Sequence, residues 1–166
     1  MLKGHLKKMN IDIKNIINEH ILTANNLLDD INLIEEICCL SLKTIEEGNT
    51  ILLCGNGGSA SDSIHISSEI VGKFEKERKA LPSISLTSNP SNLTAIANDF
   101  GFEHIFSRQI EAIGKKGDLL IAISTSGNSK NIINAINYAS SNELNVVALT
   151  GKDGGKINAM DCITLK

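Results

Sequence analysis

His65 and Glu69 are spaced for joint chemistry. They are four residues apart in a segment with a helical pattern, so their side chains are predicted to lie on one helical face. An imidazole and a carboxylate so placed can be two ligands of a zinc ion, or Glu69 can be a general base. A surface i,i+4 pair is the other interpretation that the spacing leaves open.

A glycine-rich segment precedes this pair. The apolar run Ile51–Cys54 is typical of a strand buried on both faces, and the glycines of residues 55–58 allow a sharp turn and close approach to a ligand. Ser59 is the predicted N-cap of the helix that follows. Free N–H groups, the helix dipole and the hydroxyl would then converge on one point that suits an anion, most often a phosphate.

The same segment matches a dinucleotide-binding pattern only weakly. The spacing from Gly55 to Gly57 and Ala60 fits it, but such a site also needs an acidic residue at the end of the second strand. Residues 87–89 read Thr-Ser-Asn there. A phosphorylated small molecule is therefore the predicted ligand.

A second polar segment carries four hydroxyls within six residues, and they are Ser124, Thr125, Ser126 and Ser129. It lies between a predicted strand and a predicted helix, where hydroxyls can donate several hydrogen bonds to one phosphate. An ordinary capped turn is the alternative. The glycine-rich segment on the same sheet edge favours phosphate binding.

The elements that position these segments are short apolar strands alternating with helices. This alternation predicts an α/β fold with a parallel sheet, helices on both faces and ligands at the carboxyl ends of the strands. The predicted strands are Thr50–Cys54, Ser83–Thr87, Leu119–Ile123, Val146–Thr150 and Ile163–Leu165. In the helix after the glycines, the face predicted to pack on the sheet is Ala60, Ile64, Ser67 and Val71.

Two helices are predicted before the first strand. One runs from about Met9 to Leu28, and the second is capped by Asp30 or Asn32 and ends at Gly48. The second is apolar on more than one face, so the pair is predicted to pack on the core and on a neighbouring subunit. The chain is thus predicted to divide into a helical pair, residues 1–48, and an α/β domain, residues 49–166, that binds a phosphorylated small molecule.

Composition narrows the class of protein. A net charge of −3 argues against a non-specific nucleic-acid binder, and no apolar run has the length of a membrane span. With no signal cleavage site, the expected location is the cytoplasm. The cysteines lack metal-site spacing and are predicted to be reduced and buried, and they are Cys38, Cys39, Cys54 and Cys162.

With these residues in view, the chain resembles the sugar isomerase (SIS) domain superfamily, and within it the bacterial phosphoheptose isomerases. The matching blocks follow the family order and spacing from about Gly48 to Gly155. They are residues 54–59, His65 with Glu69, 97–102, 105–108, 123–129 and 149–155.

The resemblance implies a five-stranded, flavodoxin-like parallel sheet and a homotetramer with active sites at subunit junctions. The implied reaction converts D-sedoheptulose 7-phosphate, a phosphorylated seven-carbon sugar, to D-glycero-D-manno-heptose 7-phosphate. This aldose–ketose isomerisation leads to the heptose of surface polysaccharides, either lipopolysaccharide or capsule. No nucleic-acid or membrane partner is implied.

The resemblance also assigns residues. It implies one zinc ion per subunit bound by His65 and Glu69, with Glu69 also moving a proton between neighbouring carbons. Phosphate would be held by the four hydroxyls of Ser124, Thr125, Ser126 and Ser129. The remaining substrate-binding residues would be Asn56, Gly57, Gly58, Ser59, Asn98 and Asp99.

One part of the family pattern lies past the end of this sequence. Family enzymes continue into a C-terminal helix whose Gln and His complete the zinc shell, whereas this sequence ends at Lys166. We therefore expect the sequence to be a shortened version of a longer protein, with an incomplete zinc shell.

Two other functions within the superfamily stay open at this point. One is a non-catalytic binding protein of the type that associates with the bacterial replication initiator, and the presence of Glu69 argues against it. The other is a sugar-phosphate-sensing domain, which would bind ligand through residues 124–129 without needing His65 or Glu69.

Overall fold

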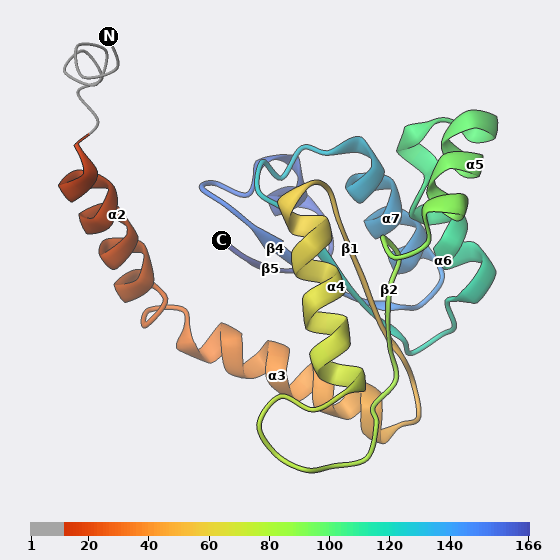
Figure 1. Ribbon diagram of the computed structural model, residues 1–166, viewed down its shortest axis with the longest axis horizontal. Coiled ribbons are helices and arrows are strands. Elements are labelled where there is room, and N and C mark those ends of the chain that lie inside the picture. The colour runs from red at the N-terminus through yellow and green to blue at the C-terminus, as the bar shows by residue number, and fades with distance from the viewer. Residues whose placement is uncertain (1–11) are drawn as a thin grey trace, which may run out of the picture. The chain divides into compact units, whose positions relative to one another are not determined.

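The computed structural model describes residues 12–166 (Figure 1). The chain divides into two compact units, Met1–Glu35 and Glu36–Lys166. Residues 1–11 lie outside the described part, including the predicted helix start at Met9. The predicted domain division after residue 48 stays a prediction.

Within residues 12–166, two helices precede the first strand, as the sequence predicts. Helix α2 (Ile13–Asn26) is capped by Asp12, whose carboxylate accepts a hydrogen bond from the Asn15 N–H at 3.2 Å. Helix α3 (Ile31–Glu46) crosses from the first unit into the second. Gly48 follows it at a φ of +82°, a conformation that favours glycine and turns the chain toward the sheet.

The second unit contains one five-stranded sheet in the order β2-β1-β3-β4-β5, with every neighbouring pair parallel. Its strands are β1 (Ile51–Gly55), β2 (Ser83–Ser85), β3 (Leu119–Ser124), β4 (Asn145–Thr150) and β5 (Ile163–Leu165). This is the flavodoxin-like strand order, so the predicted α/β fold is confirmed. The chain leaves β1 toward one edge of the sheet and β3 toward the other.

Helices connect these strands, and Figure 1 shows α4 beside β1 and β2. They are α4 (Gly58–Val71), α5 (Pro90–Phe100), η1 (Phe102–His104), α6 (Ser107–Ile113), α7 (Lys130–Ser141) and η2 (Gly155–Ala159). Among residues 12–166, no helix combines the length and the apolar character needed to cross a membrane.

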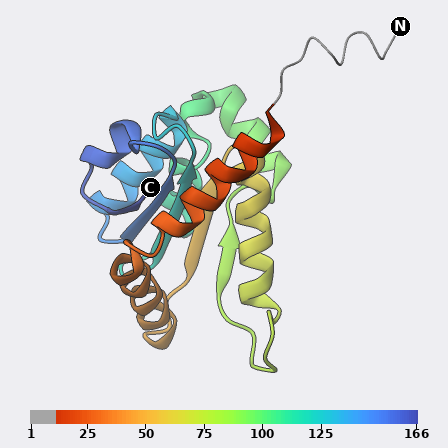
Figure 2. The same cartoon turned by 90° about the vertical axis from the view of Figure 1, so that its left-hand side faces the viewer.

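Each face of the sheet has its own hydrophobic core, because alternate strand residues point to opposite faces. Leu52 and Cys54 belong to the core that α5, α6 and α7 cover. Ile51 and Leu53 belong to the other core, which contacts residues of α3 and α4. Figure 2 shows α4 running alongside β2. The central strands are therefore fixed from both sides.

The predicted sheet-packing face of α4, made of Ala60, Ile64, Ser67 and Val71, is wrong in part. Ile64 and Val71 are exposed, whereas the buried positions are Ser63 and Ser67. Ile66 and Ile70 make the apolar contact instead. The physical reason is that small hydroxyl side chains occupy the contact between α4 and β2, so the buried face is rotated from the one that hydropathy predicts.

The prediction that the cysteines are buried is also wrong for two of them. Cys54 is fully buried in β1 and Cys162 is half-buried, but Cys38 and Cys39 are exposed on α3. In that helix Ile37 and Leu40 pack on the sheet, which directs their neighbours elsewhere. All four thiols are free, as predicted.

Candidate active site

The turn after β1 forms one wall of the site. This glycine loop, residues 55–58, turns at Gly57 with a φ of +57°, and α4 begins at Gly58. A Cβ at Gly55 would clash with the Ser59 carbonyl, so only glycine allows the helix to start this close to the strand. The predicted N-cap is wrong, because Gly57 occupies that position and Ser59 lies inside the first turn.

The turn after β3 forms the opposite wall. In this hydroxyl loop, residues 124–129, the Ser124 hydroxyl donates to the Ser129 hydroxyl at 3.3 Å. Ser129 is the N-cap of α7 but makes no side-chain capping bond. Thr125 and Ser126 are exposed. The hydroxyl loop thus presents its hydroxyls at the positive end of α7, where an anion is favoured.

The two loops share one cavity of about 190 Å³. Its lining joins Asn56 and Ser59 on the β1 side to the four hydroxyl residues on the β3 side, together with Ile123. Two adjoining cavities, of about 260 and 180 Å³, also include Asn56. The loops meet because β1 and β3 are neighbours whose last paired residues are Gly55 and Ile123.

His65 and Glu69 lie further along α4. Their Nε2 and Oε1 atoms are 3.4 Å apart, as expected of residues on one helical face. The two side chains are 76% and 38% exposed, and neither lines the cavity that the two loops share. Since a helix rises 1.5 Å per residue, His65 lies roughly 9 Å along the axis from Ser59. The pair therefore lies on the exposed surface of α4.

The other predicted sugar contacts, Asn98 and Asp99, lie at the end of α5. Both are exposed, and the Asn98 amide donates to the Asp99 carboxylate at 2.8 Å. They do not line the cavity between the two loops. The structure thus brings the four hydroxyl residues of the hydroxyl loop together with Asn56 and Ser59. It does not bring Asn98 and Asp99 to this group.

The donor set fits part of a zinc site. A neutral imidazole and a carboxylate are common zinc ligands, and a separation of 3.4 Å allows both to reach one ion. Within residues 12–166, no group of three or more His, Cys, Asp or Glu side chains is gathered for a metal. His65 and Glu69 can therefore supply two ligands of a shell that needs further donors.

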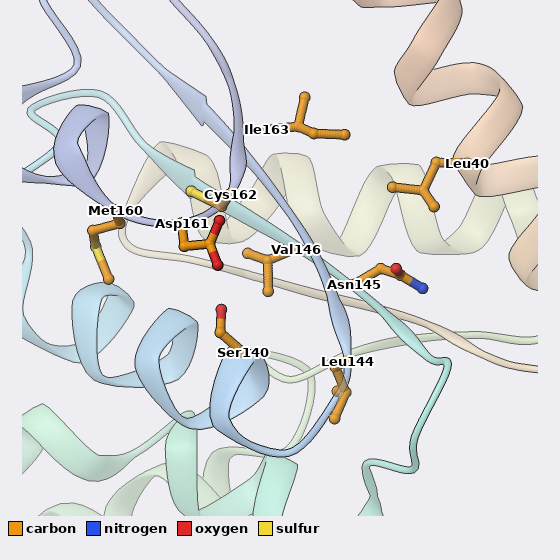
Figure 3. Close-up of a pocket in the computed structure, with 9 residues that line it drawn as sticks. All are labelled: Leu40, Ser140, Leu144, Asn145, Val146, Met160, Asp161, Cys162 and Ile163. Carbon is orange, nitrogen blue, oxygen red and sulfur yellow. The ribbon is translucent and has the colours of Figure 1, made fainter.

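A larger cavity, of about 500 Å³, lies elsewhere (Figure 3). It opens at the amino ends of β4 and β5 and is lined by residues such as Leu144, Val146 and Cys162. The Asp161 carboxylate and the Ser140 hydroxyl are its acidic and hydroxyl groups. Because ligands of doubly wound sheets bind at the carboxyl ends, we place the site between the two loops despite the smaller volume.

Asn131 is a residue of this region that the sequence reasoning missed. It is buried in the first turn of α7 and lines the cavity of about 260 Å³ beside Asn56 and Ser129. A signal was present, because Asn131 precedes the buried Ala135 by four residues and so shares its inward face. A polar residue on a buried helical face beside a polar loop needs a hydrogen-bond partner.

The comparisons with known proteins agree with this geometry. The SIS domain family model matches residues 19–151. A phosphoheptose isomerase from Aliarcobacter butzleri is 50% identical over 132 residues, which cover 80% of this chain and 70% of that relative. The chain belongs to the phosphoheptose isomerase family. The family resemblance that the sequence motifs predict is confirmed.

Other phosphoheptose isomerases extend the match. The one from Neisseria gonorrhoeae is 53% identical over 121 residues, covering 73% of this chain and 61% of that relative. The structure of a phosphoheptose isomerase from Francisella tularensis superposes with a TM-score of 0.82 at 35% identity, covering 96% of this chain and 83% of that one. The shared fold thus includes nearly all of this chain.

Proposed function

We propose that this phosphoheptose isomerase family member interconverts D-sedoheptulose 7-phosphate and D-glycero-D-manno-heptose 7-phosphate. The observation that carries the proposal is the cavity in which the glycine loop meets the hydroxyl loop, in a chain 50% identical to a phosphoheptose isomerase. A phosphate needs several donors, and a sugar chain needs polar groups that fix its orientation. The hydroxyls that line this cavity can donate to the phosphate, and Asn56 on its opposite side is a polar group for the sugar chain.

In this proposal the hydroxyl loop holds the phosphate. Thr125 and Ser126 are exposed at the cavity, while Ser124 and Ser129 already contact each other through their hydroxyls. The amino end of α7 adds a favourable field for the phosphate charge. The sugar chain then extends along the glycine loop, with Asn56, Gly57 and Gly58 as its proposed contacts.

Glu69 is the proposed base. In a ketose-to-aldose conversion, a base removes a proton from C1, an enediolate forms, the proton of the C1 hydroxyl passes to O2, and a proton returns to C2. The Glu69 carboxylate is partly exposed and lies 3.4 Å from the His65 imidazole, so it can exchange a proton with a bound ligand. The carbonyl end of the sugar must then reach the outward face of α4.

We propose that the sugar is brought to Glu69 at a junction between subunits of a homotetramer. The outward position of His65 and Glu69 supports this, because an exposed pair can face a site to which a neighbouring copy contributes. Helix α2 offers a surface for association, since it buries none of its residues and exposes Ile13, Ile16, Ile17, Ile21 and Leu22.

We also propose zinc as the cofactor, with His65 and Glu69 as two of its ligands. Zinc would stabilise the negative charge that develops on the substrate oxygen during enolisation. The bound metal should be detectable by elemental analysis of the purified protein after dialysis. His65→Ala should reduce its amount, whereas His20→Ala, on α2, should not.

The deciding experiment replaces Glu69 by Gln in the full-length protein, supplied with zinc. We expect isomerase turnover to fall about 100-fold or more, while affinity for inorganic phosphate stays within about twofold of the parent protein. Glu47→Gln is the matched control, because Glu47 also forms an exposed i,i+4 pair, with Lys43 at 3.8 Å. Turnover that survives in the Glu69 variant would refute the base assignment.

We place the reaction in the cytoplasm, as a step toward the heptose of a surface polysaccharide. The proposal rests on the substrate, since a sugar phosphate is charged and does not cross a membrane unaided. A strain lacking the gene should lose heptose from lipopolysaccharide or capsule, measured by sugar analysis. Unchanged heptose content would contradict this placement.

A further inference from the structure

We propose that Asn131 is a positioning residue that locks the glycine loop to the hydroxyl loop through Asn56. The inference rests on the proposed function, because it concerns how the same cavity holds the two ends of a sugar phosphate. It adds a residue of α7 that neither the motif reasoning nor the family match assigns to the site.

The two asparagine side chains form a reciprocal pair. The Asn56 amide donates to Asn131 Oδ1 at 2.9 Å, and the Asn131 amide donates to Asn56 Oδ1 at 2.8 Å. The two residues are 75 positions apart in the sequence. Asn131 is only 2% exposed, so water competes little for these bonds.

The orientation of the pair is determined by the backbone. The Ile132 N–H lies 3.0 Å from Asn131 Oδ1, and because an N–H can only donate, the atom it meets must be the oxygen. The Asn131 nitrogen must then face Asn56 Oδ1. Each hydrogen bond of the pair therefore has one possible direction, and an aspartate at position 131 cannot reproduce it when ionised.

The pair begins where the sheet stops. The last residues paired between β1 and β3 are Gly55 and Ile123, so no strand pairing holds the loops together beyond them. Asn56 is the next residue, and it lines each of three adjoining cavities. The asparagine pair thus continues the connection from the sheet into the binding site.

The pair also orients Asn56 toward a ligand. An amide has two N–H hydrogens and two oxygen lone pairs, and the contacts with Asn131 use one of each on Asn56. One donor and one acceptor remain in fixed directions at the cavity. A sugar hydroxyl can use both. Because the Asn56 side chain is already fixed by Asn131, less conformational entropy is lost when the sugar binds.

The test compares two variants of the full chain at several pH values. Asn131→Asp buries a carboxyl group, whose pKa should rise because burial disfavours the charged form. When protonated, its O–H can donate to Asn56 Oδ1 in place of the amide, but when ionised two acceptors face each other. Asn131→Leu has a similar size and cannot form the pair at any pH.

The measured quantity is the affinity for sedoheptulose 7-phosphate and for inorganic phosphate, as a ratio to the parent protein at the same pH. We expect the affinity of the Asp variant for sedoheptulose 7-phosphate to be within about threefold of the parent's at pH 5 and roughly tenfold weaker at pH 8. The Leu variant should be roughly tenfold weaker for the sugar phosphate at both pH values. Asn137→Asp, an exposed position on the same helix, should give a constant ratio.

Two outcomes would overturn the proposal: a pH-independent ratio for the Asp variant, or parent-like sugar-phosphate affinity in the Leu variant. The latter would mean that charge repulsion alone explains the Asp result. Circular dichroism of each variant at each pH establishes that it is folded, and return of binding at pH 5 shows that the Asp variant keeps its site.

A separate readout distinguishes failure of this proposal from failure of the proposed reaction. In the parent protein, the paired side-chain amide hydrogens of Asn56 and Asn131 should exchange slowly with deuterium in NMR spectra, and the Leu variant should lose this protection at Asn56. Slow exchange in a protein without isomerase turnover would overturn the reaction and keep the pair. Fast exchange in an active protein would overturn the pair alone.

Discussion

Cys54 lies at the end of the buried apolar run of β1, one residue before the glycine loop. It is fully buried, and burial raises the pKa of its thiol from 9.0 to about 12, because the thiolate cannot be solvated there. The thiol therefore stays protonated under ordinary conditions and is a packing group rather than a nucleophile.

This pKa predicts how stability depends on pH. Between pH 9 and pH 12 the unfolded chain loses the Cys54 proton while the folded chain keeps it, so rising pH favours unfolding. From pH 9 to pH 10 the free energy of unfolding should fall by about 1 kcal/mol through this residue. In Cys54→Ala, urea denaturation at pH 8 and pH 10 should show a smaller decline than in the parent. Equal declines would contradict the buried thiol.

At the residue scale, sequence reasoning is best where chemistry depends on local spacing. The four-residue step from His65 to Glu69 predicts a shared helical face, and the two side chains lie 3.4 Å apart. Asn131 shows the limit, because its partner Asn56 is 75 positions away and only the folded sheet brings them together. The roles of His65, Glu69 and Asn131 stay predictions that the variants above test.

Helix α4 and strand β2 are joined by hydroxyl groups rather than by apolar side chains. The Ser63 hydroxyl is hydrogen-bonded with Ser85 at 2.9 Å and with Thr87 at 3.0 Å. Further along, the Ser83 hydroxyl donates to Ser67 at 3.1 Å. Hydroxyl side chains are small, so this hydroxyl seam lets the helix approach the strand closely.

The seam predicts an unusual response to a larger side chain. Ser63→Val should lower the free energy of unfolding by about 1–3 kcal/mol, because it crowds the contact and leaves buried hydroxyls with fewer partners. Ser68→Val, at an exposed position of the same helix, is the control and should change it by about 0.5 kcal/mol or less. Urea denaturation measures both. Equal effects would show that the seam does not limit the approach of α4.

The two loops should differ in how they tolerate an added methyl group. Gly127 has a φ of +61°, and a Cβ there would clash with the Gly154 carbonyl, whereas a Cβ at Gly58 meets nothing within 4 Å. Gly127→Ala should cost about 2 kcal/mol or more of stability and weaken phosphate binding roughly tenfold.

Gly58→Ala is the matched variant for this comparison. It should keep the stability of the parent to within about 0.5 kcal/mol, so any loss of sugar-phosphate affinity would report a direct contact with the ligand. Thermal denaturation measures stability, and titrations with inorganic phosphate and with sedoheptulose 7-phosphate measure the two affinities. A stable Gly127→Ala protein with normal phosphate affinity would contradict the close contact between Gly127 and the Gly154 carbonyl.

At the scale of elements, strands were easier to predict than the faces of helices. Each predicted strand matches an observed one to within two residues at either end, because short apolar runs between polar turns are distinctive. The buried face of α4 was misassigned because Ser63 and Ser67 are polar, and hydropathy cannot show that hydroxyl pairs satisfy each other inside the protein.

The exposed apolar side chains of α2 predict self-association of the whole molecule. Ile17 is 53% exposed and Ile16 is 56% exposed. We expect light scattering to give four times the 17.8 kDa chain mass, and Ile17→Glu to reduce it, because a charge cannot enter an apolar contact unpaired. Asn18→Glu is the control on the same helix. A monomeric parent protein would contradict the proposed tetramer and its shared sites.

The fold class followed from the sequence because alternation of strands and helices survives even where single residues are misjudged. The alternation does not by itself determine the strand order, since the order depends on the direction in which each crossover connection runs. That order is what makes β1 and β3 neighbours and so gives the cavity its two walls.

The chain leaves β1 and β3 toward opposite edges of the sheet. This connectivity affects which residues of the site can be replaced during evolution. No connection has to pass over the gap between these strands, so the opening is a product of connectivity, and the close start of α4 beside it also needs glycine at position 55. During evolution the residues that line the opening can therefore be replaced, which changes the ligand that fits, while the strand order that creates the opening stays the same.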